Sequence, residues 1–287
     1  MLKKKNSKTM RFLYQLTATI LIMMILVSCG RNTPSGGDKP ENEGKPGVTE
    51  QQNKQQDSDK KSEKENDTGK YVTPATAAQS YSQFLEAKSN MVTRLTDALA
   101  NNPDTGLTSL SFMGLALVDL AMLPATSFGL GDQAAASALG LFGFQDVVYS
   151  ENGDQYSVKY KNAEGTPCEL KGEYNKAADA LKCTGLIEGK EELVYEYCKT
   201  SFGYVGQIYT IKDDGTSYVY QIAVSGKDGV VGMADATENP ESLTGNESIE
   251  FPKQCPEWYS IKGDEVTGLT SDGENISFTY TPTEETE

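Results

Sequence analysis

Residues 207–224 read QIYTIKDDGTSYVYQIAV and form the clearest β-hairpin pattern in this chain of 287 residues. In the second arm, Tyr218, Tyr220 and Ile222 alternate with Val219 and Gln221. A period of two is typical of a strand with one buried face. The intervening Asp-Asp-Gly is favoured in tight turns, because Gly and Asp tolerate positive φ. The stretch therefore predicts two antiparallel strands joined by a short turn.

The same alternation extends in both directions from this hairpin, starting at Gln145. Turn signals recur, most of them about 11–14 residues apart, as in a series of short strands. They lie at 152–154, 163–165, 175–176, 188–190, 213–215, 227–229, 262–264 and 272–273. We expect about nine to eleven antiparallel strands in a long meander, and a sheet of that length has to curl.

The segment before Gln145 has a helical period instead. Thr73-Pro74 reads as a helix start, since Pro is favoured at the first helical position. An amphipathic helix of about 25 residues should follow, with Lys88 as the only break in its apolar stripe. Asn101-Asn102-Pro103 should end it. The stripe consists of Phe84, Leu85, Met91, Val92, Leu95, Ala98 and Leu99.

Two further helical segments complete this part. Residues 107–123 are apolar on nearly all sides, with Asp119 inside the run, and predict a buried core helix. Residues 129–144 are rich in Ala, Gly and Leu, with Asp132 as the expected N-cap. The alternative for 129–144 is an exposed apolar patch that binds a partner or a lipid. The expected fold class is α+β, with N-terminal helices packed against a long curved antiparallel β-meander.

One interval breaks the regular strand spacing. Residues 235–258 contain three prolines, two of them before the end of the stretch, and many polar residues; loops of this length are uncommon and often functional. The other interpretation is a surface excursion held in place by Cys255. Tyrosines are also frequent in the strands, where they favour cross-strand packing over a sugar-stacking or lipid-lining row.

Residues that carry chemistry are few. The chain contains no histidine, which excludes Ser-His-Asp and Cys-His nucleophiles and the usual histidine metal sites. The carboxylate pairs Glu191-Glu192 and Asp213-Asp214 are adjacent, so on a strand they would point to opposite faces. A glycosidase needs two carboxyl groups that converge on one cleft. We therefore expect a protein without enzymatic activity, metal site or cofactor. A carboxylate-based hydrolase is the weakest alternative.

Four cysteines lie in the second half of the chain: Cys168, Cys183, Cys198 and Cys255. Reflection about a turn at 175–176 places Cys168 opposite Cys183, which would allow a cross-strand disulfide. Cys183–Cys198 is the competing pair, and free buried thiols are the third option. No C-x-x-C spacing points to a metal.

The N-terminus has the features of an export signal. Basic residues at 3–5, 8 and 11 precede an apolar run that ends in Leu26-Val27-Ser28-Cys29. This ending resembles the lipobox of bacterial lipoproteins. The resemblance implies cleavage after residue 28 and attachment of lipid, such as palmitate, to the Cys29 thiol. It implies a protein anchored to the cell membrane on its extracytoplasmic face.

Composition divides the remaining chain into two parts. Residues 30–70 hold 8 basic and 9 acidic residues and only one aliphatic side chain, Val48, which predicts a disordered linker. We thus expect a signal peptide (1–28), a lipidated cysteine with linker (29–70) and a single domain (71–287). The domain should have a helical part (71–144) and a β-meander (145–281).

Charge and motif content together suggest a binding role. Residues 71–287 carry 13 Lys and Arg against 32 Asp and Glu, a net charge of −19, which disfavours nucleic acid. The leading hypothesis is a non-enzymatic interaction module of the cell envelope, acting on an envelope protein or glycan through the sheet surface or the long loop. The alternative is a carrier of an apolar ligand such as a lipid, in a cavity of the curved sheet.

Overall fold

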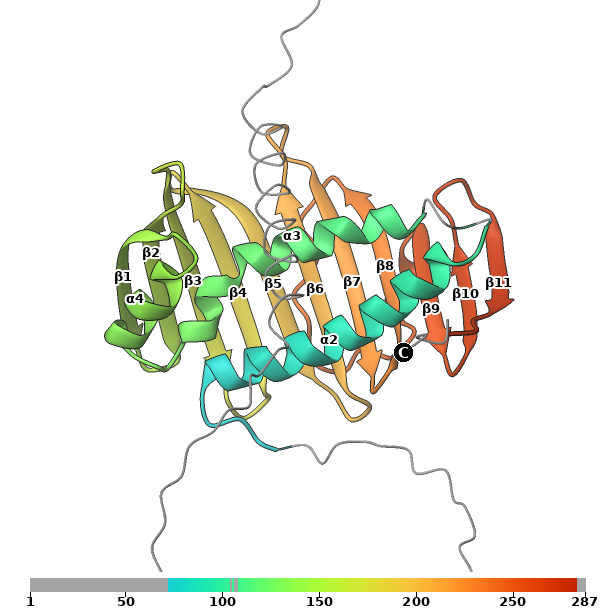
Figure 1. Ribbon diagram of the computed structural model, residues 1–287, viewed down its shortest axis with the longest axis horizontal. Helices are drawn as coiled ribbons and strands as arrows, with labels where there is room; N and C mark the ends of the chain where they lie inside the picture. Colours follow the sequence, from blue (N-terminus) through green and yellow to red (C-terminus); the bar gives the residue numbers. More distant parts are fainter. Residues whose placement is uncertain (1–71, 104, 106–107, 283–287) are drawn as a thin grey trace, which may run out of the picture. The chain divides into compact units, whose positions relative to one another are not determined.

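The structure, a computed structural model, describes residues 72–103, 105 and 108–282. Within these residues, eleven antiparallel strands form one open sheet, and their order in the sheet is their order in the chain (Figure 1). The strands are β1 (Gln145–Asn152), β2 (Gln155–Lys161), β3 (Pro167–Asn175), β4 (Ala180–Ile187), β5 (Lys190–Lys199), β6 (Tyr204–Ile211), β7 (Ser217–Ser225), β8 (Asp228–Ala236), β9 (Glu257–Lys262), β10 (Glu265–Leu269) and β11 (Asn275–Thr279). The α+β class, the meander order and the first strand at Gln145 are confirmed.

The longest helix in the described part of the chain, α2 (Ala77–Ala100), begins three residues later than predicted. Thr76 is its N-cap: its Oγ1 accepts a hydrogen bond from the Gln79 backbone N–H at 3.2 Å. The Gln79 side chain in turn accepts from the Ala75 N–H at 2.8 Å. These two hydrogen bonds satisfy two backbone N–H groups at the start of the helix. The cap is therefore Thr76 and not Thr73. The helix ends where predicted, with Asn101 as its C-cap.

The expected core helix at 107–123 is divided. It consists of the 3₁₀ helix η1 (Thr108–Phe112) and the helix α3 (Met113–Ala121), and the 3₁₀ helix η2 (Leu123–Ser127) follows. The last helix, α4 (Asp132–Gly140), has Gly131 as its N-cap, so the prediction of Asp132 was wrong by one residue. Gly131 has a φ of 87°, which Gly adopts without the cost that other residues incur.

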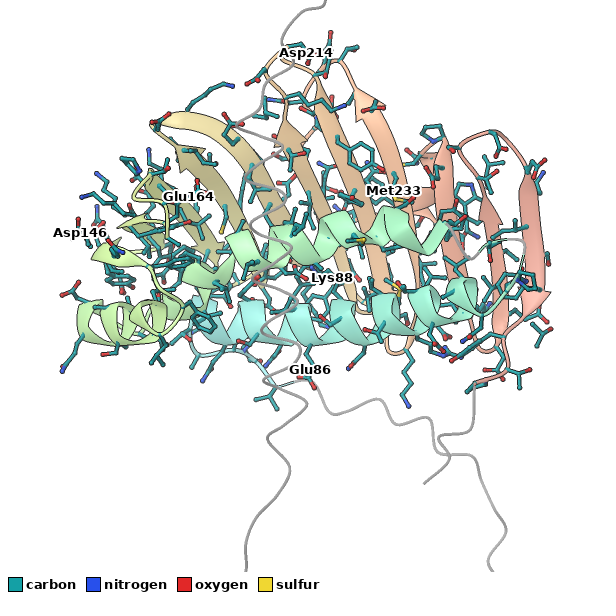
Figure 2. The ribbon with its side chains drawn as sticks, turned by 45° about the horizontal axis from the view of Figure 1, so that its top comes forward. Glu86, Lys88, Asp146, Glu164, Asp214 and Met233 are labelled. Atoms are coloured by element: carbon teal, nitrogen blue, oxygen red, sulfur yellow. The ribbon has the colours of Figure 1, made fainter. Side chains whose placement is uncertain are left out.

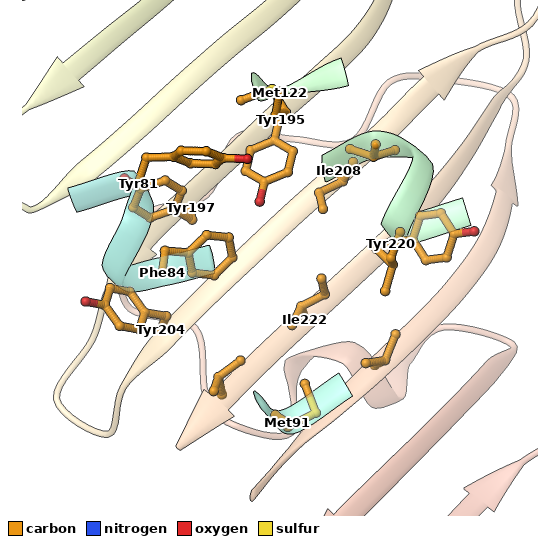
Figure 3. Close-up of a cluster of buried hydrophobic side chains, with 14 of the residues drawn as sticks. Tyr81, Phe84, Met91, Met122, Tyr195, Tyr197, Tyr204, Ile208, Tyr220 and Ile222 are labelled. Carbon is orange, nitrogen blue, oxygen red and sulfur yellow. The ribbon is translucent and has the colours of Figure 1, made fainter. Parts of the chain in front are cut away.

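The helices α2 and α3 lie across one face of the sheet, which we call the inner face (Figure 1). Its side chains pack on the helices: Phe84 of α2 stacks on Tyr197 of β5, with ring centroids 4.3 Å apart. Figure 3 shows this cluster. The tyrosines of this face therefore pack in the core between the helices and the sheet, whereas the sequence predicted packing between neighbouring strands. The buried inner-face residues include Tyr195, Tyr197, Tyr204, Ile208, Tyr220 and Ile222.

Glycines in the strands let helix side chains approach the sheet backbone. A Cβ at Gly206 would lie 2.7 Å from Phe84 Cζ, and one at Gly172 would lie 2.3 Å from Phe128 Cε2. A Cβ at Gly229 would lie 2.9 Å from Met91 Cγ. At these three places the helices rest directly on the strands, so aromatic and Met side chains fill the space between the two layers.

We expect Gly206→Ala to lower the free energy of unfolding by about 1–3 kcal/mol, because the new methyl group overlaps the Phe84 ring. Urea denaturation of both proteins measures this difference. The matched control is Gly140→Ala, since Gly140 ends α4 and nothing lies within 4 Å of a Cβ there. That change should be neutral or stabilise by up to about 1 kcal/mol. Equal stability of the two variants would contradict this account of the packing.

Candidate binding surface on the outer face

The opposite face of the sheet, which we call the outer face, carries a continuous line of polar side chains. Strand register places each member directly opposite the next, from β1 to β7. We call this line the polar row; it consists of Asn152, Gln155, Glu173, Lys182, Glu196, Gln207 and Gln221. Side chains that are opposite in neighbouring strands lie close enough to interact. The row is thus one hydrogen-bonding surface that crosses seven strands.

The β5–β7 half of the polar row is covered by the long segment between β8 and β9. Three consecutive residues of that segment are held by side chains of the row. Gln207 Nε2 donates to the Glu241 carbonyl at 2.7 Å, and the Leu243 N–H donates to Glu196 Oε1 at 3.2 Å. Between them, Lys182 Nζ donates to Ser242 Oγ at 2.5 Å. The row therefore binds a stretch of the protein's own chain.

The same segment is also fixed at its C-terminal end. Cys255 Sγ donates to Gln221 Oε1 at 3.3 Å, and a Cβ at Gly232 would lie 2.1 Å from the Pro252 carbonyl oxygen. The expectation of an excursion held by Cys255 is confirmed. The sequence did not reveal the second attachment at Glu196 and Gln207, although a buried Glu needs such partners.

The β1–β4 half of the polar row is open. It borders a hollow of about 460 Å³, which we call the polar hollow. A volume of this size is in the range of small-ligand sites, roughly 300–1,000 Å³. Lys171 and Lys182 supply donors, and Glu173 supplies acceptors. The lining residues are Ser150, Glu151, Asn152, Gln155, Tyr156, Ser157, Lys171, Gly172, Glu173, Lys182 and Thr184.

Charge is unevenly distributed along the sheet. Residues 145–187, which form β1 to β4, contain 5 Lys and 7 Asp or Glu. Residues 190–282 contain 6 Lys and 16 Asp or Glu. The polar hollow therefore lies at the less acidic end of the domain, where an acidic ligand meets the least repulsion.

A second polar cluster lies between α2, α3 and β5. Lys88 Nζ forms an ion pair with Asp119, and the Lys88 side chain is only 1% exposed. Lys88 is labelled in Figure 2. Burial lowers the pKa of Lys88 and raises the pKa of Asp119, because both charged forms lose hydration. The two polar residues that interrupted apolar patterns in the sequence thus meet in the core, which periodicity alone did not predict.

The predicted disulfide between Cys168 and Cys183 is not formed. Cys168 lies opposite Ile187, and Cys183 lies opposite Gly172. The turn is longer than predicted because Asn175 pairs with Ala180, and Asp179 within it accepts a hydrogen bond from Ser80 Oγ at 2.5 Å. The competing pair fails as well, since Cys183 lies opposite Tyr195 and Cys198 opposite Ala180. All four cysteines are free thiols.

The adjacent carboxylates found in the sequence make ordinary contacts. Glu191 and Glu192 lie at the start of β5, and Asp213 and Asp214 lie in the turn between β6 and β7. Lys190 Nζ lies 3.1 Å from a Glu192 carboxylate oxygen and 3.4 Å from one of Asp213. Asp214 accepts hydrogen bonds from Thr216. Among the described residues, no group of three or more Cys, Asp or Glu side chains is arranged to hold a metal ion.

Residues 129–144 were expected to form either a packed helix or an exposed apolar patch, and the structure shows some of each. Ala135 and Leu139 of α4 are buried, whereas Leu130, Leu141 and Phe142 are exposed. Leu141 is 88% exposed. An apolar corner is therefore present beside β1, at the same end of the sheet as the polar hollow.

The expected lipidation site, Cys29, and the linker lie outside the described residues. In the part of the chain that is described, no helix has the length and apolarity needed to cross a bilayer. Comparison of the chain with protein families, curated proteins and solved structures gave no match.

Proposed function

We propose that this protein is a lipoprotein of the bacterial cell envelope whose domain binds extended, polar peptide segments in the polar hollow. It acts by binding and performs no chemistry on its ligand. The lipobox-like ending at Cys29 supports the membrane anchor. The polar composition of residues 30–70 favours a linker between the anchor and the domain, through which the domain would reach ligands above the bilayer.

A single observation carries the choice of ligand. The polar row already holds a peptide, because Glu241, Ser242 and Leu243 each bond to one of its side chains. Two of these bonds go to backbone groups, which any peptide offers. The open half of the row has the same residue types, and Lys182 stands at the junction of the two halves. A ligand peptide would continue along the row where the protein's own segment stops.

The packing of the inner face favours this surface over a lipid-carrying cavity. The side chains of Phe84, Met91 and Phe128 occupy the places where a ligand between the layers would have to lie. The two layers are in van der Waals contact there, so an apolar ligand would have to displace them. We therefore place the binding site on the outer face.

A binding measurement with defined probes tests the proposal. The full chain in detergent is titrated with synthetic polar octapeptides and, in parallel, with neutral oligosaccharides. We expect peptides to bind, and Gln155→Leu together with Lys171→Ala to weaken binding by at least about tenfold, since lost hydrogen bonds to charged groups are each worth about 1.5–3 kcal/mol.

The matched control is Ser277→Ala, which lies on the exposed β11 strand at the far end of the sheet. This variant should bind peptides as the unaltered chain does. Equal binding by the hollow variant and the control would place the site elsewhere. Binding of oligosaccharides alone would refute the peptide assignment.

A further inference from the structure

The buried pair of Lys88 and Asp119 has the geometry of two groups that can react with each other. The two residues are 31 positions apart, on α2 and on α3, and Lys88 Nζ contacts Asp119 Oδ1 directly. Lys88 is almost completely enclosed, whereas the Asp119 side chain is 24% exposed. The Tyr195 side chain lies beside the amine: its hydroxyl is 3.4 Å from Nζ, and its ring centroid is 5.5 Å away.

This environment favours the neutral forms of both groups. Desolvation disfavours an ammonium and a carboxylate alike, and it acts as the largest influence on the pKa of each residue. One proton transfer within the contact converts the ion pair into a free amine beside a carboxylic acid. A free amine is a nucleophile, and the carbon of a protonated carboxyl group is an electrophile. Fixed proximity favours their reaction strongly over the same reaction in water.

We propose that Lys88 and Asp119 condense to form an intramolecular amide bond between α2 and α3. Lys88 Nζ attacks Asp119 Cγ, and the new Nζ–Cγ bond forms. The Cγ–O bond to the protonated hydroxyl oxygen breaks, and the amine proton leaves with that oxygen as water. No atom is oxidised or reduced, so the step needs no co-reactant.

The hydroxyl groups of Tyr195 and Tyr81 lie near the reacting pair and are hydrogen-bond donors. The attack places negative charge on the remaining carboxyl oxygen, and a hydrogen-bond donor stabilises such an oxyanion. The Tyr195 hydroxyl already contacts the reacting amine. The Tyr81 hydroxyl is buried and has no hydrogen-bond partner in the described part of the chain, and its ring packs on Tyr195 at 5.9 Å. The exposed edge of Asp119 gives the released water a route to solvent.

The bond would have a mechanical consequence. The linker joins the domain at the start of α2, so a pull on the membrane anchor would act first on that helix. An amide bond would transfer the load from α2 to α3 through a covalent link instead of through side-chain packing. This inference stands independently of the proposed peptide ligand.

Peptide mass spectrometry tests the bond. The full chain is purified from the expressing bacterium, denatured and digested with trypsin. Trypsin cannot cleave after an acylated lysine, so residues 71–94 should stay in one piece, joined to residues 95–159 and lighter than their sum by one water. Fragmentation should place the junction at Lys88 and Asp119.

Two variants serve as negative controls. Lys88→Arg and Asp119→Ala each remove one reacting group, and both should release residues 71–88, 89–94 and 95–159 as separate peptides. A succinimide at Asp119 also loses one water, but it leaves Lys88 open to trypsin, so the cleavage pattern separates the two products. Complete cleavage after Lys88 in the unaltered chain would overturn the proposal, whether or not the variants fold.

Discussion

Asp119→Ala is expected to lower the free energy of unfolding by about 3–5 kcal/mol, one of the two largest effects we foresee. The substitution leaves Lys88 enclosed between α2, α3 and β5 without its partner. The amine must then stay charged without compensation or lose its proton at a cost. Chemical denaturation of the unaltered chain and the variant gives the difference. Stabilities that agree within error would show that the pair contributes nothing to the fold.

The double variant Lys88→Met with Asp119→Leu separates an ion pair from an amide. Replacing a buried ion pair by apolar residues of similar size is often neutral or stabilising. If only an ion pair is present, the double variant should recover most of the lost stability. If the amide is present, it should remain less stable by about 3–4 kcal/mol, which is the loop-closure contribution for a link across 31 residues.

High pH is expected to unfold the protein, and this is the second large effect. Burial raises the pKa of Tyr81, Tyr195 and Tyr197 above the ordinary value near 10, and it raises the pKa of Tyr174 to about 12. The folded state therefore holds these protons more tightly than the unfolded chain does. The resulting stability is complete below about pH 10 and is lost as the pH rises through the folded pKa values. We expect unfolding to begin between pH 10 and about 12.

Tyrosinate absorbance and circular dichroism, followed together, measure this transition. The buried tyrosines should ionise only as the secondary structure is lost. Tyr81→Phe removes one buried phenol that has no partner among the described residues, so it should shift the alkaline midpoint upward and cost little at neutral pH. Full ionisation of all tyrosines near pH 10 in a protein that keeps its circular dichroism spectrum would contradict the expected burial.

Periodicity was enough to predict the sheet. The alternation around Tyr218 and Ile222 and the regular Gly and Asp turns describe local geometry, and a meander pairs only neighbouring strands. Errors arose where a distant contact decided a local structure. The turn after Asn175 is longer than expected because Asp179 bonds to Ser80, which is 99 positions earlier in the chain. That shift of the ladder moved Cys168 away from Cys183.

The candidate surface was harder to predict for the same reason. Asn152, Gln155, Glu173 and Lys182 are ordinary exposed strand residues in the sequence. They become one row only through the register of three hairpins. Lys88 and Asp119 were visible as breaks in apolar patterns, but their contact depends on the relative placement of two helices, which periodicity does not specify.

The order of the strands also bears on how the chain completes its fold during synthesis. The two strands of each hairpin are neighbours in the sequence, so they can pair as soon as both have left the ribosome. Such local contacts form fast. Helix α2 is synthesised first, yet it contacts strands from β4 to β9. Its apolar stripe thus has no complete surface to cover until translation has passed Lys262. Phe84 can be covered once β5 and β6 have formed, but Met91 packs on β8 and stays exposed to water for longer. A chaperone that binds exposed apolar helices would therefore act longest on the C-terminal half of α2.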